Sequence, residues 1–184
     1  PECPLLDVAP AVRPLDPVLA RGARMICRRA APVAHPQGSC SPADPRFDPF
    51  WARVNEAGIS VAYHSGDNGY NKFANEWGVG GEFRSFDYDP LRICLSASPI
   101  QDTLAALLCH GLFDRFPRLR VATIESGSEW VAPLLAKLKK AHGQLPMLFR
   151  SDPVELFRRH VWVAPYYEDD LEAYEFEVGN FKLQ

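Results

Sequence analysis

The sequence lacks the patterns that mark membrane spans, secretion and nucleic-acid binding. No apolar run approaches the roughly 18 residues of a membrane span, and the formal net charge is -3, from 20 basic and 23 acidic residues. Without a basic surplus, nucleic acid and anionic membranes are poor candidate partners. The first 30 residues are rich in Pro, Asp and Arg, unlike a signal peptide. We therefore expect a cytoplasmic protein.

Cysteine pairs and nucleotide-binding loops are also missing. The five cysteines are scattered without a CxxC pair, which predicts reduced thiols rather than a zinc or redox site. Neither GxGxxG nor GxxxxGK[ST] occurs, so the usual evidence for a nucleotide-binding sheet is lacking. HxH and HExxH are absent too. No short motif by itself supplies a metal site.

The remaining pattern is an alternation of short apolar runs with helical segments. The 184 residues are 47% hydrophobic, enough for a single domain with a buried core. Four runs read as buried parallel strands: 24–30, 59–64, 120–125 and 160–165. Helices are predicted over 12–20, 48–58, 98–114, 126–140 and from 152. The alternation predicts an α/β fold with four parallel βα units, typical of an open doubly wound sheet or of half a (βα)8 TIM barrel. The missing nucleotide motifs favour the barrel.

Helix starts support these boundaries. Asp48 precedes a proline and is predicted to be an N-cap, and Gly58 is predicted to end that helix. Ser98 and Asp152 also precede a proline, and each is predicted to be the N-cap of the helix that follows it. The long segment 65–92, rich in aromatic residues, separates the second strand from its helix. A connection of that length is typical of a loop that covers an active site.

Polar residues follow the predicted strands, where catalytic groups of parallel α/β proteins gather. His64 ends the second strand, and either binds a metal or is a histidine satisfied at a strand end. Glu125 ends the third strand, where burial of a carboxylate requires a partner. Asp67 is either a turn residue or a group that hydrogen-bonds the ring of His64 or a substrate hydroxyl. Arg28 and Arg29 point to opposite faces of the first strand, so only one faces the site.

Three segments together resemble the amidohydrolase-2 family of the amidohydrolase superfamily, which includes relatives of aminocarboxymuconate semialdehyde decarboxylase and resorcylate decarboxylase. They are 44–58 (DPRFDPFWARVNEAG), 61–70 (VAYHSGDNGY) and 111–127 (GLFDRFPRLRVATIESG), with Trp130 beyond them. The resemblance implies a (βα)8 barrel with one divalent metal, usually zinc with manganese as the alternative. It also implies ligands from a His-x-His or Glu-x-His motif on the first barrel strand, a His from a middle strand and an Asp from the last. His64 matches the middle-strand ligand.

The sequence departs from this family in two ways. Well-studied members carry a substrate-contacting His where this sequence has Glu125, so a carboxylate is expected to transfer the proton instead. No His-x-His or Glu-x-His motif lies near the start, and no Gly-Ser-Asp motif follows residue 171. We therefore expect an incomplete chain, carrying about half a barrel and one of the expected ligands.

The combined prediction is a metal-dependent enzyme that hydrolyses a small carboxylated or aromatic substrate with a metal-activated water. The alternatives are a non-oxidative decarboxylase on the same scaffold and a catalytically inactive truncated barrel. His64 is expected to bind the metal, with Glu125 and Asp67 as catalytic groups. Arg28 or Arg29 and Tyr70 are expected to hold the substrate, under a cover that includes Trp77. The exposed sheet edges of half a barrel also predict either self-association, expected as a homodimer, or missing chain.

Overall fold

A computed structural model describes residues 15–34, 38–65, 70–79, 90–95, 98–167 and 169. The elements along the chain are α2 (Leu15–Ala20), β1 (Met25–Arg29), η1 (Pro45–Phe47), α3 (Asp48–Ala57), β2 (Ser60–His64), α4 (Asn71–Glu76), α5 (Leu91–Cys94), α6 (Pro99–Cys109), α7 (Leu112–Arg115), β3 (Arg120–Ile124), α8 (Val131–Gln144), η2 (Pro146–Leu148), α9 (Pro153–His160) and β4 (Val161–Val163). None of the helices in these ranges has the length and apolar character needed to span a lipid bilayer.

The strands form one parallel sheet in the order β1-β2-β3-β4, so all four predicted strands and their direction are confirmed. The register pairs Arg29 with His64, and His64 with Ile124. Parallel neighbours lie about 4.8 Å apart, so these three residues form one row at the carboxyl end of the sheet. The parallel order therefore brings Arg29 and His64 to one edge, together with Ile124, the residue before Glu125.

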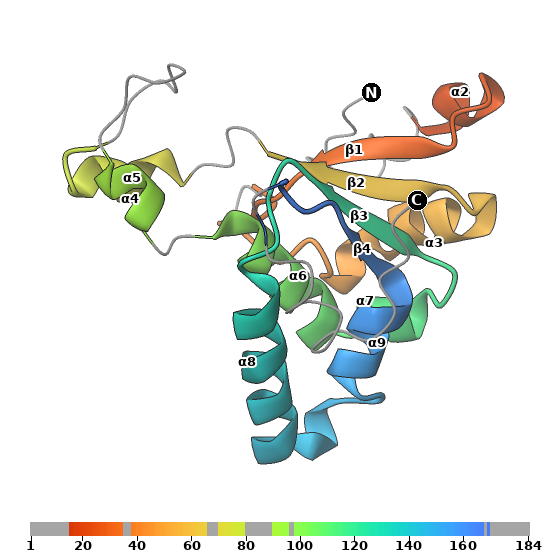
Figure 1. The fold of residues 1–184 in the computed structure, drawn as a ribbon. Helices are drawn as coiled ribbons and strands as arrows, with labels where there is room; N and C mark the ends of the chain where they lie inside the picture. The colour runs from red at the N-terminus through yellow and green to blue at the C-terminus, as the bar shows by residue number, and fades with distance from the viewer. Residues whose placement is uncertain are drawn as a thin grey trace.

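The two faces of the sheet differ in what covers them. Helices α3, α6, α7, α8 and α9 gather on one side (Figure 1). The strand residues that face them are almost fully buried, as in Ile26, Val61 and Val121. On the opposite face Met25 is 44% exposed and Trp162 is 42% exposed. The described core thus lies between the sheet and one layer of helices.

The start of α3 differs from the prediction. Asp44 accepts a hydrogen bond from the Arg46 amide at 3.0 Å and caps the 3-10 turn η1. Asp48 is already the first residue of α3, so its predicted role as an N-cap is wrong. The reason is that the Asp-Pro pair recurs four residues upstream and starts the helical turn there. Gly58 ends α3 in a left-handed conformation, as predicted (φ 65°).

Two other predicted helices are also shorter or shifted. The segment 98–114 divides into α6 and α7 because Gly111 adopts φ 65°, which an α-helix does not tolerate. The helix predicted from residue 126 begins at Val131, because Glu125 and Gly127 both have positive φ, and it continues to Gln144. The predicted caps Ser98 and Asp152 are confirmed, since each side chain accepts a backbone amide hydrogen bond.

The predicted cover segment 65–92 is described only in part. Residues 66–69 and 80–89 lie outside the described residues. Helices α4 and α5 belong to the described part, and Figure 1 shows them apart from the sheet and its helices, beyond one end of the strands. Trp77, at the end of α4, is 59% exposed. The segment thus contains helices in addition to loop.

Candidate active site

His64 presents one ring nitrogen at the carboxyl end of β2. Its side chain is 44% exposed, and its Nδ1 lies 2.7 Å from the main-chain oxygen of Ser65. A carbonyl oxygen only accepts hydrogen bonds, so Nδ1 carries the hydrogen and Nε2 keeps its lone pair when the ring is neutral. Metal-binding histidines commonly have their second nitrogen oriented in this way. His64 therefore suits the role of a metal ligand through Nε2.

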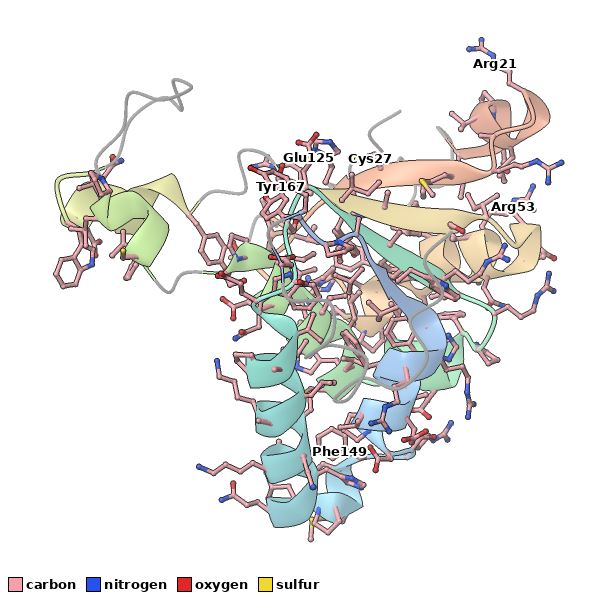
Figure 2. The ribbon with its side chains drawn as sticks, in the orientation of Figure 1. Arg21, Cys27, Arg53, Glu125, Phe149 and Tyr167 are labelled. Carbon is pink, nitrogen blue, oxygen red and sulfur yellow. The ribbon has the colours of Figure 1, made fainter. Side chains whose placement is uncertain are left out.

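Glu125 lies beside that free nitrogen. Its Oε2 is 3.6 Å from His64 Nε2 and accepts a hydrogen bond from the Ser65 hydroxyl at 3.2 Å. The side chain is 64% exposed, so its position does not require the burial of a carboxylate. Its backbone φ of 53° continues the chain away from the line of β3, which leaves the carboxylate at the rim. Figure 2 shows Glu125 at the end of the sheet where Tyr167 also lies.

A lone pair and a carboxylate oxygen that face one another are stabilised by a cation or a proton between or beside them. The 3.6 Å separation suits two ligands of one ion, since zinc bonds to N and O are about 2.0–2.2 Å long. Protein metal sites generally need at least three ligands. Within the described residues no group of three or more His, Cys, Asp and Glu side chains is placed to hold a metal. His64 and Glu125 therefore fit part of a metal site.

The structure separates the two arginines of β1. Arg28 is only 7% exposed, and its guanidinium carbon lies 5.4 Å from the centre of the Phe50 ring on the helix-covered face. Arg29 lies on the other face, in register with His64, and is exposed. Arg29 is therefore the arginine that shares the face and the row of His64. Arg28 packs within the core, which makes it unsuited to the expected substrate contact.

Of the remaining predicted residues, Tyr70 and Trp77 are not brought to this pair. Asp67 lies outside the described residues. The Tyr70 hydroxyl donates to Asp102 Oδ2 at 2.9 Å, beside a cavity of about 310 Å³ between α6 and the segment that follows β1. Partial burial and the Asp102 carboxylate raise the pKa of Tyr70 to about 12. Trp77 lies at the end of α4, which with α5 is apart from the sheet, and its side chain is exposed.

Sequence reasoning missed three residues that hold this edge together. Ser65 links His64 to Glu125 through its carbonyl oxygen and its hydroxyl. Ser128 and Asp169 are hydrogen-bonded to one another, across the loops that follow β3 and β4. A small polar residue after a strand is a common turn signal, so nothing in the sequence distinguishes these three. In the contacts between Ser65 and Glu125 and between Ser128 and Asp169, the two residues are more than 40 positions apart in the sequence.

The chain is similar in sequence and structure to known proteins. A family model described as amidohydrolase matches residues 10–178. An amidohydrolase from Mycobacterium avium subsp. paratuberculosis K-10 is 43% identical over 97% of this chain and 45% of its own, with a TM-score of 0.88. A comparison with curated proteins finds no match.

More distant solved structures share the fold. The 5-carboxyvanillate decarboxylase of Sphingomonas paucimobilis is 18% identical with a TM-score of 0.66, over 94% of this chain and 50% of its own. A dihydroxybenzoic acid decarboxylase from Polaromonas sp. JS666, solved with manganese and 2-nitroresorcinol, is 14% identical with a TM-score of 0.67, over 94% and 52%. The chain spans about half the length of these proteins. The four βα units are thus part of a TIM-barrel-type fold, which confirms the predicted fold class.

Proposed function

This chain belongs to the amidohydrolase family, and we propose that its protein is a metal-dependent hydrolase that acts on a small carboxylated or aromatic substrate. The observation that carries the proposal is the pairing of His64 Nε2 with Glu125 Oε2 at 3.6 Å, at the carboxyl end of parallel strands. The activity is proposed for the whole protein, and the described residues form part of its active site.

The 3.6 Å pairing allows Glu125 to be a second metal ligand or a base, and the proposal gives it the base role and leaves the metal to His64. His64 holds a divalent metal, zinc or manganese, through Nε2, while Ser65 fixes its tautomer from the other side of the ring. A bound metal would supply Lewis acidity, which polarises a substrate oxygen and makes water more acidic. Glu125 accepts the proton that water loses as it attacks the substrate. Its side chain is 64% exposed, so the carboxylate is within reach of water, which suits this role.

Arg29 gives the proposed site a preference for anions. It lies one strand from His64 on the same face, and it is exposed. A guanidinium group binds a carboxylate through two parallel hydrogen bonds. We therefore propose that Arg29, rather than Arg28, contacts the carboxylate of the substrate.

Decarboxylation is the second candidate, because two of the similar structures are aromatic acid decarboxylases. In that reaction the carboxylate leaves as carbon dioxide, and a proton reaches the carbon that carried it. Glu125 would then have to act as the acid. Its 64% exposure favours the base role and therefore hydrolysis.

Metal analysis of the whole protein tests the proposal. We expect close to one equivalent of zinc or manganese in the wild type, a loss of at least tenfold in His64→Ala, and no change in His142→Ala. His142 is the matched control because it lies on α8, with Asp152 as its partner. A metal-free wild-type protein would overturn the proposal. Carbon dioxide release from hydroxybenzoates, measured against hydrolysis of lactones and amides, separates the two reactions.

The proposed homodimer is tested separately by light scattering of the same sample. A mass that corresponds to one chain would contradict it. This result bears on assembly alone and leaves the site proposal unchanged.

A further inference from the structure

The loop that carries Glu125 is held by residues that follow β4. The Tyr166 hydroxyl donates a hydrogen bond to the main-chain oxygen of Glu125 at 2.8 Å. Asp169 Oδ2 accepts from the Tyr166 amide at 2.8 Å, and the same oxygen accepts from the Ser128 hydroxyl. The loop after β4 is thus hydrogen-bonded to the loop after β3 at two residues, Glu125 and Ser128, which lie on either side of Gly127.

The Tyr166 ring also packs closely against Gly127. A Cβ at position 127 would lie 2.8 Å from two ring carbons, closer than such atoms approach. Gly127 has φ +57°, a conformation that side chains disfavour. A glycine is therefore needed at position 127 for two reasons, its positive φ and the close approach of the Tyr166 ring.

This contact matters because Glu125 has an unfavourable backbone conformation. It is the one non-glycine residue with positive φ among the described residues. Such a conformation persists where the surroundings impose it, and it is often found at functional sites. The direction of the Glu125 side chain follows from its backbone angles, so a constraint on its carbonyl group also directs its carboxylate. A chain free to relax would carry the carboxylate away from His64.

We propose that Tyr166 is a positioning residue, supported by Asp169, which holds the Glu125 carboxylate beside His64. Tyr166 acts through the main chain of Glu125 and the Gly127 backbone. The catalytic consequence rests on the proposed function, whereas the structural consequence does not. The two are therefore tested by separate measurements.

The structural measurement compares Tyr166→Phe with Tyr167→Phe in the whole protein. Both changes remove one phenol hydroxyl, but Tyr167 is 99% exposed and serves as the matched control. Backbone chemical shifts report φ at position 125. The change that Glu125→Gln causes in the ring nitrogen shifts of His64, measured at a fixed pH, reports whether the carboxylate lies beside the ring. We expect this change in the His64 shifts to be at least twofold smaller when Tyr166→Phe is also present. With Tyr167→Phe instead, we expect it to keep its wild-type size.

The kinetic measurement uses the same proteins. We expect kcat to fall on the order of 10-fold or more in Tyr166→Phe with KM within twofold, because the displaced group acts on the chemical step. If Tyr166→Phe does not fold, Asp169→Asn weakens the same link while it keeps the Tyr166 hydroxyl. Unchanged shifts at Glu125 and an unchanged effect on His64 would overturn the proposal. A wild-type protein without activity would contradict the proposed function alone, since the shifts still decide the positioning role.

Discussion

Replacement of Glu125 by glycine is expected to stabilise the fold while it abolishes activity. A left-handed conformation costs a residue with a Cβ about 1–2 kcal/mol, and Glu125 has φ 53°. Glycine avoids this cost but loses about 0.5–1 kcal/mol more backbone entropy on folding. The lost side-chain contacts are exposed, and contribute a few tenths of a kcal/mol at most.

Alanine at the same position isolates the backbone effect. Glu125→Ala and Glu125→Gly lose the same carboxylate contacts, but only alanine keeps the strain. We expect the glycine variant to be more stable than the alanine variant by about 0.5–1 kcal/mol, measured by urea unfolding. At the control position Glu129, which lacks a positive φ, alanine should instead be the more stable by about 0.5–1 kcal/mol. Equal stabilities of the two Glu125 variants would refute the strain argument.

Two further changes test other parts of the structure. Gly127→Ala should lower the free energy of unfolding by about 1–3 kcal/mol, since its Cβ would meet the Tyr166 ring at 2.8 Å. The control Gly143→Ala, in α8 with open space around it, should raise this free energy by about 0.5–1 kcal/mol, and a similar loss at both positions would contradict the steric account. Burial lowers the pKa of His160, so the unfolded chain takes up the proton first as the pH falls below about 6.5. Urea midpoints should therefore decrease from pH 7.5 to pH 5.5, less so in His160→Gln, and equal decreases in both proteins would contradict this reasoning.

Much of the fold followed from the sequence because local chemistry determines it. Apolar runs of strand length, broken by turn residues and followed by helical periodicity, predicted all four strands and the α/β class. Errors arose where one local signal competed with another. The Asp-Pro pair at Asp48 recurs at Asp44, and the earlier copy starts the helical turn. A positive φ at Gly111 divided a pattern that is periodic in sequence.

The candidate site could be predicted only in part. Strand ends predicted His64 and Glu125, because parallel strands present their carboxyl ends at one edge. The alternation of side chains showed that Arg28 and Arg29 lie on opposite faces, but not which face the helices cover. That choice depends on the packing of α3, whose Phe50 ring faces Arg28. The left-handed Glu125 and its contact with Tyr166 likewise depend on a loop 41 residues away, and no local pattern records contacts between loops so distant in sequence.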